Sequence, residues 1–470
     1  MGGRRLRTVG HRMSRWARLL TVLLIGVVPI LAPARAAAIG SPQVPPGDPP
    51  PGAVAPPDPT EQKTACGVGT LSPGTRLDLR PSADVMLNYS SAWRFSRGAG
   101  QKVAVVDTGV APNPRLHALE PGGDYVSSSD GLVDCDAHGT LVAGLIAAAP
   151  SPDDAFAGVA PDAAILSIRQ NSDLYSVKGT GSAQGDPNAV SPGYGNTRTL
   201  ALAIVHAVDM GATVINLSET ACAPVGGGLD DAAVGQAVRY AFEHNVVVVA
   251  AAGNVSTQGL CSAQNEVRDP NLPLADAWNS VRTIASPAWF REYVLAVGAV
   301  APNGQPSDFS LHGPWVSLAA PGEQLISLSP NGPGLMNAWQ DPQRGLVPVN
   351  GTSFATPLVS GLVALVRARF PTMTAGEVMT RIKRTAQTPQ TGPNAATGYG
   401  VIDPVAALTA DLPPVRDMPD PLAGRPISGP PKLSKSETRA RDISLVVVAS
   451  CAVLAAVALT VAKSRSRDHE

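Results

Sequence analysis

Five short apolar runs recur through the middle of the chain, separated by stretches whose apolar spacing is that of a helix. The runs are predicted strands at 103–106, 164–168, 213–217, 246–252 and 294–300. Helices are predicted between them, at 200–209 and 232–242 among others, because apolar residues return there every three or four positions. This alternation predicts an α/β fold with a doubly wound parallel sheet and helices on both faces.

Two polar turns in this pattern carry candidate catalytic side chains. Asp107 directly follows the strand at 103–106, and sheets of this kind hold their sites at the carboxyl ends of their strands. His138 stands just before a helix of small residues at 140–149. Taken singly, the acid would be read as a cap or turn former and the histidine as a structural residue.

A third polar turn, Asn-Gly-Thr-Ser-Phe-Ala-Thr-Pro at 350–357, leads into an apolar helix at 358–367 and carries Ser353. Pro357 is expected in the first helical turn, where a missing N–H costs little. Unpaired N–H groups and the helix dipole favour negative charge at such a position, which suits a nucleophile that generates an oxyanion. Ser353 alone would be read as an N-cap. An acid, a histidine and a serine in this chain order, however, match the subtilisin order of an Asp-His-Ser triad.

The chain resembles a subtilase, and four motifs in its middle part carry the resemblance. They are Val-Asp-Thr-Gly at 106–109, His-Gly-Thr-Leu-Val-Ala-Gly at 138–144, the apolar strand and Ala-Gly-Asn at 246–254, and Gly-Thr-Ser-Phe-Ala-Thr-Pro at 351–357. We therefore expect a subtilisin-like catalytic domain over 93–410, which is long enough to bury one large core.

The resemblance implies a role for each motif residue. Ser353 would attack the scissile carbonyl, His138 would take and return the proton, and Asp107 would orient the imidazole. Asn254 would donate its side-chain amide to the oxyanion beside the Ser353 N–H. The implied activity is that of a serine endopeptidase, which acts on protein or peptide substrates.

The segment around Ser218 departs from the subtilase pattern. Subtilases commonly have Ser-Leu-Gly-Gly along the S1 and S4 side of the cleft, whereas here Glu219 and Thr220 follow Ser218. Ser218 is the expected substrate-binding residue, and a narrow or polar specificity pocket is expected around it. Three polar stretches, 171–196, 255–287 and 327–349, would either border the cleft or be disordered surface insertions.

The N-terminal part predicts export. Arginines precede an apolar run at 19–31, and an Ala-x-Ala cleavage signal follows, so residues 1–38 are expected to be a signal peptide, with a retained N-terminal anchor as the alternative. Residues 39–92 form a proline-rich extension whose first part, 41–60, is expected to be extended and mobile. This extension leaves little room for a folded inhibitory prodomain. We expect it to stay attached and to wrap the catalytic domain without plugging the cleft.

The C-terminal part predicts a membrane anchor. Residues 411–442 form a proline-rich linker, and 443–462 form an uncharged run close to the roughly 20 residues that span a bilayer. Basic residues in the tail, 463–470, place the C-terminus in the cytoplasm and the catalytic domain on the extracytoplasmic, periplasmic side of the cell membrane.

This order of segments resembles that of the mycosins, the membrane-bound subtilases of type VII secretion systems in mycobacteria and related actinobacteria. The resemblance implies that the enzyme processes secreted substrates and contacts components of the secretion membrane complex. Two alternatives stay open: a mainly structural stabiliser of that complex, and a general surface protease.

Four cysteines, Cys66, Cys135, Cys222 and Cys261, lie in the predicted extracytoplasmic part, where disulfides persist. Cys222 and Cys261 follow two strands that one helix joins and that should be neighbours, so we predict that they pair. Cys66 then pairs with Cys135, while Cys451 in the predicted membrane helix stays a free thiol.

Composition excludes some functions. Charged residues are 16% of the chain and no basic patch with aromatic residues is present, so nucleic-acid binding is not expected. No metal-ligand cluster or cofactor motif is evident. The acidic pairs at 153–154 and 230–231 could contribute to calcium sites, although adjacent surface acids are more typical of turns and caps.

Overall fold

The computed structural model describes residues 39–180, 186–256, 261–265, 274–341 and 344–413, together with 450, 453–454 and 456–458. The predicted signal peptide and most of the predicted linker and membrane helix lie outside these residues. Within them, no helix is both long enough and apolar enough to cross a membrane.

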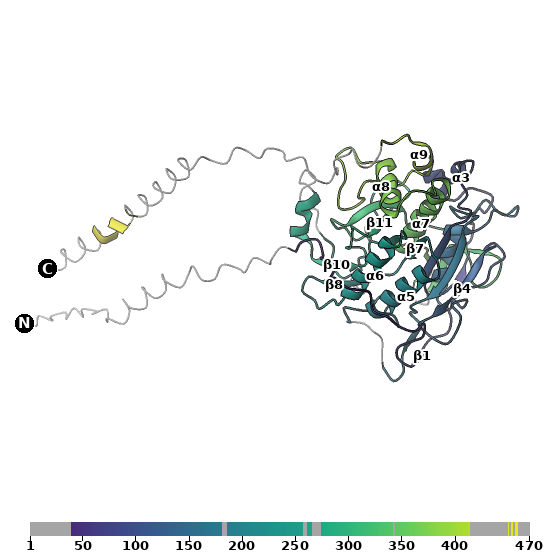
Figure 1. The fold of residues 1–470 in the computed structure, drawn as a ribbon, viewed down its shortest axis with the longest axis horizontal. Coiled ribbons are helices and arrows are strands. Elements are labelled where there is room, and N and C mark those ends of the chain that lie inside the picture. The colour runs from purple at the N-terminus through teal and green to yellow at the C-terminus, as the bar shows by residue number, and fades with distance from the viewer. Residues whose placement is uncertain are drawn as a thin grey trace, which may run out of the picture.

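A seven-stranded parallel sheet forms the centre of the molecule, with the strand order β12-β11-β9-β7-β3-β5-β4 (Figure 1). Its strands are β3 Lys102–Asp107, β4 Leu119–Asp124, β5 Ala164–Arg169, β7 Val214–Leu217, β9 Val247–Ala251, β11 Val294–Val300 and β12 Val316–Pro321. The five inner strands are the predicted ones. The two edge strands were not predicted, because β4 reads Leu-Glu-Pro-Gly-Gly-Asp and has no apolar run to signal it.

Helices cover both faces of this sheet, as the doubly wound fold requires. They are α2 Ser82–Leu87, α3 Tyr89–Ala92, α4 His138–Ala147, α5 Thr197–Asp209, α6 Ala232–Glu243, α7 Thr352–Arg369, α8 Ala375–Thr385 and α9 Pro404–Thr409, with a 3-10 helix at Leu274–Ser280. Along β3, Val103 and Val105 pack into the core that contains α4 and α7, whereas Ala104 and Val106 pack into the core that contains α5 and α6. Side chains alternate because successive residues of a strand point to opposite faces.

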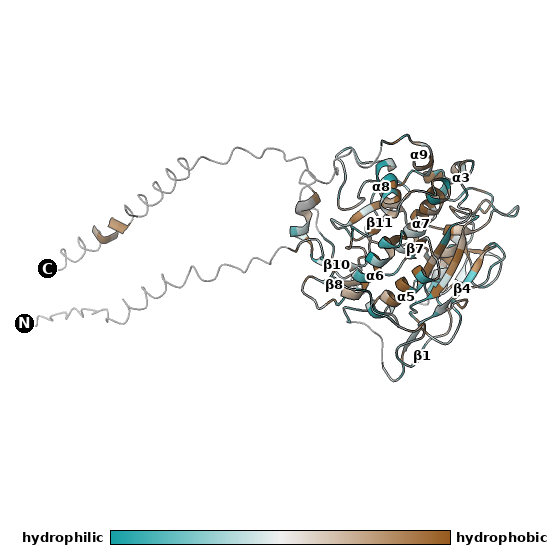
Figure 2. Cartoon of the chain, viewed as in Figure 1, coloured by the Kyte–Doolittle hydropathy of each residue, from teal (hydrophilic) through white to brown (hydrophobic). Residues whose placement is uncertain are grey.

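Helix α7 is buried along most of its length, since every residue from Thr352 to Val366 is buried. Figure 2 shows the strands of the sheet largely in the brown of hydrophobic residues, whereas α8 at the surface also carries hydrophilic teal. The expected position of Pro357 was wrong. The helix already begins at Thr352, so Pro357 lies beyond the first turn and inside the helix.

The proline-rich extension lies against the catalytic domain at several points. Strand β1 Thr60–Gln62 pairs with β6 Tyr175–Val177, and β2 Gly69–Thr70 pairs with β15 Ala338–Asp341. Further toward the N-terminus, the Pro45 carbonyl accepts a 3.1 Å hydrogen bond from Arg239 Nη1 on α6. The structure thus places part of 41–60, the stretch expected to be mobile, against α5 and α6, with Val44 near Gly235 and Gly52 near Leu202.

The described parts of the three polar stretches carry regular elements. Besides β6 and β15 they contribute β10 Thr283–Ser286, β13 Ser327–Leu328, β14 Leu335–Met336 and β16 Gly345–Pro348, and β10 pairs with β8 Ala221–Pro224. These parts are therefore structured, in contrast to the alternative of disordered insertions. That the stretches border the cleft stays a prediction.

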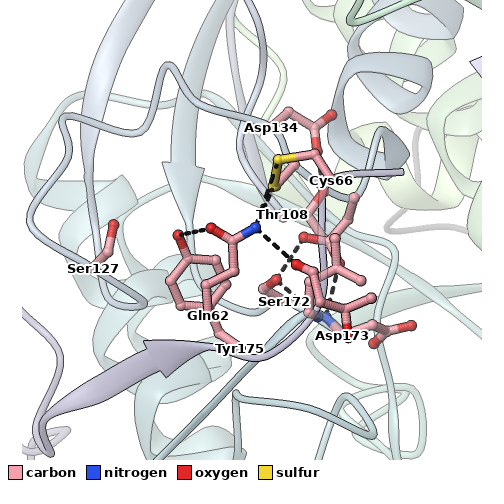
Figure 3. The surroundings of a disulfide bond; sticks show 12 residues. Gln62, Cys66, Thr108, Ser127, Asp134, Ser172, Asp173 and Tyr175 are labelled. Carbon is pink, nitrogen blue, oxygen red and sulfur yellow. Dashed lines mark hydrogen bonds between the residues drawn. A yellow bond between two sulfur atoms is a disulfide. The ribbon is translucent and has the colours of Figure 1, made fainter. Parts of the chain in front are cut away.

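Two disulfides join the cysteine pairs predicted from the sequence, Cys66 with Cys135 and Cys222 with Cys261, while Cys451 lies outside the described residues. Figure 3 shows the first bridge beside Thr108 and Asp134. The Gly67 N–H also donates a 2.8 Å hydrogen bond to the Cys135 carbonyl, so backbone and bridge hold the extension to the same loop.

We predict that Cys66→Ser loosens the extension without abolishing activity. The bridge closes a loop across a sequence separation of 69. In the chain-entropy model such a bridge contributes roughly 4 kcal/mol. Limited proteolysis should cut the variant within 39–92 faster than the parent protein. Equal cleavage rates for the two proteins would contradict this role.

Candidate active site

Asp107 and His138 form a short hydrogen bond at the carboxyl edge of the sheet. Asp107 ends β3 and is fully buried, and His138 begins α4 with its side chain 16% exposed. The distance from His138 Nδ1 to Asp107 Oδ1 is 2.7 Å. The same carboxylate oxygen accepts from the Thr108 N–H at 2.8 Å. This pair leaves Nε2 as the imidazole nitrogen that is free to exchange a proton.

Two glycines permit the close approach of these elements. A Cβ on Gly139 would lie 2.0 Å from the Gly109 carbonyl oxygen and 3.2 Å from Asp107 Oδ1. Gly109 itself has φ of 99°, a left-handed backbone that favours glycine, and a Cβ there would lie 2.1 Å from the Val133 carbonyl oxygen. Gly109, two residues after Asp107, and Gly139, directly after His138, are thus needed because a larger side chain would not fit at either position.

Asp134 was not singled out from the sequence, but it ties the two motifs together. One of its oxygens accepts from Thr108 Oγ1 at 2.8 Å, and the other accepts from the Thr140 N–H and Oγ1 at 2.8 and 2.6 Å. Burial raises the pKa of Asp134 to about 7, even though these hydrogen bonds act in the opposite direction. The only sequence signal was its position four residues before His138.

Ser353 lies at the second residue of α7 and is 6% exposed. The next side chain, Phe354, packs on the imidazole of His138 with ring centroids 4.8 Å apart. In the described part of the chain, the Ser353 hydroxyl makes no hydrogen bond to the His138 ring. Such bonds are often long in the absence of substrate and tighten when it binds.

Asn254 is exposed and its amide is oriented by the start of α7. Its Oδ1 accepts from the Thr352 N–H at 2.9 Å and from Thr352 Oγ1 at 3.0 Å. A Cβ placed on Gly351 would lie 3.6 Å from Asn254 Nδ2 and 2.7 Å from Ser353 Oγ. The amide donor and the serine hydroxyl therefore both border the small space beside Gly351.

Ser218 supports the nucleophile through the carbonyl group of Ser353. Because Pro357 has no N–H, the Ser353 carbonyl lacks its usual helical donor. Ser218 Oγ donates to that carbonyl instead, at 2.8 Å, and itself accepts from Asn216 Nδ2 at 2.8 Å. The hydroxyl of the residue expected to bind substrate thus has a structural partner.

Glu219 brings a second carboxylate to the catalytic histidine. Its Oε1 lies 3.6 Å from His138 Nδ1, and its side chain is 25% exposed. Burial raises the pKa of Glu219, although the His138 charge lowers it. Burial alone would lower the pKa of His138, but Asp107, Glu219 and Asp134 together raise it above its ordinary value. The sequence indicates Glu219 only as a residue that lines the cleft.

One acid of each pair considered for calcium has a strong partner within the protein. Asp154 pairs with the Arg115 guanidinium at 2.9 Å, and Asp231 accepts from the Trp289 indole at 2.7 Å. Elsewhere in the described residues, Asp107, His138 and Glu219 come close enough to share an ion. There, however, the His138 nitrogen nearest the carboxylates is already bonded to Asp107.

A model of the subtilase family matches residues 98–400. The chain therefore belongs to the subtilase family of serine proteases, and within it to the mycosins. Mycosin-1 of Mycobacterium tuberculosis is 45% identical over 415 residues, which cover 86% of this chain and 91% of that protein.

Two solved structures support the same family assignment. The crystal structure of MycP1 from the ESX-1 type VII secretion system is 45% identical, with a TM-score of 0.74 over 80% of this chain and 98% of that one. A chain in the structure of an intact ESX-5 inner membrane complex is 42% identical, with a TM-score of 0.74 over 89% of this chain and all of that one.

We predict that Ser218→Ala destabilises the protein, because it leaves the buried Ser353 carbonyl without a donor. An orphaned buried acceptor costs about 1–3 kcal/mol. Urea unfolding should show a loss of this size, and Ser218→Thr, which keeps the hydroxyl, should recover most of it. Equal free energies of unfolding for Ser218→Ala and the parent protein would show that the hydrogen bond contributes nothing.

Proposed function

We propose that the chain is an endopeptidase whose chemistry is carried by Asp107, His138 and Ser353. The observation that supports this most directly is the 2.7 Å bond between Asp107 Oδ1 and His138 Nδ1. Ser353 lies at a helix N-terminus and directly precedes Phe354, which packs on that ring. Ser353 Oγ attacks the scissile carbonyl while His138 Nε2 takes its proton, and the imidazolium then returns the proton to the leaving amine. Asp107 holds the tautomer and stabilises the charged ring.

The tetrahedral oxyanion would form beside Gly351. Asn254 donates from Nδ2 because Thr352 holds its Oδ1, and the Ser353 N–H is the second donor. The N-terminus of α7 adds a favourable dipole. Donors that are oriented before substrate arrives need no reorganisation during the reaction.

We further propose that the substrates are proteins of a type VII secretion system and that cleavage is restricted. The solved relatives come from ESX-1 and from an ESX-5 inner membrane complex, which supports the setting. The half-buried Glu219 and the buried Thr220 beside Ser218 favour a selective cleft. The predicted helix at 443–462 would anchor the enzyme, with its catalytic domain outside the cytoplasm.

A second candidate role is structural support of the secretion complex. The observation that favours it is the similarity to a chain of an intact inner membrane complex over 89% of this sequence. Such a role needs the surface of the fold and does not need the catalytic groups. The two roles are compatible with each other, and a third possibility, a general surface protease, has no comparable support.

We predict that Ser353→Ala abolishes peptide hydrolysis and labelling by fluorophosphonates while the fold stays intact, since only one hydroxyl is lost. The melting temperature should stay within a few degrees, and Ser151→Ala, on a surface turn, is the matched control. In a strain that lacks the gene, Ser353→Ala should fail to restore substrate cleavage. If it restores secretion, the structural role is independent of catalysis. Wild-type turnover by the variant would refute the triad.

We predict that Asn254→Ala lowers kcat by about two to three powers of ten, the loss seen in a subtilisin when one oxyanion donor is removed. Because Asn254 also accepts from Thr352, Asn254→Asp is the informative companion: it keeps the acceptor and lacks the amide donor. Both variants should show the loss in kcat rather than in KM. If Asn254→Asp turns over normally, the amide is not an oxyanion donor.

A further inference from the structure

The catalytic histidine faces two carboxylates rather than one. His138 Nδ1 is 2.7 Å from Asp107 Oδ1 and 3.6 Å from Glu219 Oε1. The two acids reach the ring from different elements, because Asp107 ends β3 and Glu219 follows β7. Along the described chain, no lysine or arginine forms an ion pair with Glu219. The protonated imidazole of His138 is thus the cationic partner of Glu219.

The neighbouring groups make this environment strongly acidic. Asp107 and Asp134 raise the pKa of His138. Burial, Asp107, Asp136 and Asp173 raise the pKa of Glu219, whereas the charge of His138 lowers it. Each of these acids accepts hydrogen bonds of its own, from Thr108 and Thr140 to Asp134, from Ser172 to Asp136 and from Ser191 to Asp173. Arg169, which lowers the pKa of Asp136, is itself paired with Asp124 at 3.4 Å. Asp107, Glu219 and Asp134 therefore favour positive charge on the imidazole, and that charge in turn favours the ionised form of Glu219.

We propose that Glu219 is a positioning residue that holds His138 in its charged form in the free enzyme, so that Glu219 and Asp107 together set the pH at which the enzyme becomes active. This proposal rests on the proposed role of His138 as general base. A base must be neutral before it can accept the proton of Ser353. A carboxylate that favours the imidazolium therefore shifts the pH midpoint of activity to a higher value.

Once the reaction starts, the Glu219 carboxylate favours catalysis instead of opposing it. When His138 takes the proton from Ser353, the ring becomes positive, and Glu219 stabilises that charge. Neutralising Glu219 should therefore raise activity at low pH and lower the plateau at high pH, so that the two pH profiles cross. A change that only disturbed the fold would lower activity at every pH and would leave the midpoint in place.

The test compares the full-length parent protein with Glu219→Gln and Glu219→Asp by the rate of fluorophosphonate labelling between about pH 5 and 10. Glu219→Gln keeps the shape and removes the charge, so its midpoint should fall by about one pH unit. Below the midpoint it should then label up to about tenfold faster. Glu219→Asp should stay near the parent midpoint. Glu243→Gln, an exposed acid on α6, is the control for loss of one negative charge. An unchanged midpoint in Glu219→Gln would overturn the proposal.

A second measurement does not depend on activity. In protein labelled with ¹⁵N-histidine and carrying Ser353→Ala, the His138 ring resonances report its titration directly. The midpoint should again be lower with Gln at position 219, and equal midpoints would overturn the proposal even if the variant labels poorly. Failure of the proposed function looks different: the parent protein would not be labelled at Ser353 at any pH.

Discussion

The burial of helix α7 is the constraint from which the geometry of the site follows. Its first fifteen residues are buried, and it packs against β7, β9, β11 and β12. A helix buried on all sides cannot rotate or slide by one residue without moving apolar groups into space already filled. Ser353, at its start, is therefore placed by the core of the whole domain.

Because α7 is buried, one of its backbone carbonyls needs a hydrogen-bond donor from a neighbouring element. Pro357 lies inside α7 and leaves the Ser353 carbonyl without a helical donor. Ser218, at the end of β7, supplies that donor, and Asn216 and Ser360 continue the chain of hydrogen bonds between strand and helix. The nucleophile is thus connected to the neighbouring strand by the same residue that the sequence suggests for the cleft.

Electrostatics around His138 differ from those of an isolated acid-histidine pair. Asp107, Asp134 and Glu219 all lie near the ring, and only Asp107 is directly hydrogen-bonded to it. Both carboxylate oxygens of Asp134 accept hydrogen bonds from hydroxyl and amide donors. Asp134 thereby connects the motif of Asp107 to the motif of His138. Cys135, next to it in the chain, carries the disulfide from the extension. The N-terminal extension is therefore covalently joined to the loop that leads to the catalytic base.

The sequence by itself determined the inner strands, the helices α4, α5, α6 and α7, the triad and oxyanion candidates, and both disulfide pairs. It could do so because these features depend on local signals: buried runs of fixed period, short motifs with required glycines, and the order of strands and cysteines along the chain. The edge strands β4 and β12 were missed because their residues have only a weak local preference for strand, and pairing with the neighbouring strand compensates for it.

Only the tertiary structure decided which groups surround His138. Glu219 reaches it from a segment that is distant in the sequence, and nothing in its local pattern predicts a contact across the sheet edge. Asp134 is only four residues before His138, but its effect on the ring depends on its burial and its hydrogen bonds. The early start of α7, which puts Pro357 inside the helix, was likewise set by packing, because the surrounding core and the Ser218 hydroxyl compensate for the lost N–H. Long-range contacts of this kind depend on how the strands are ordered in space, which local periodicity does not encode.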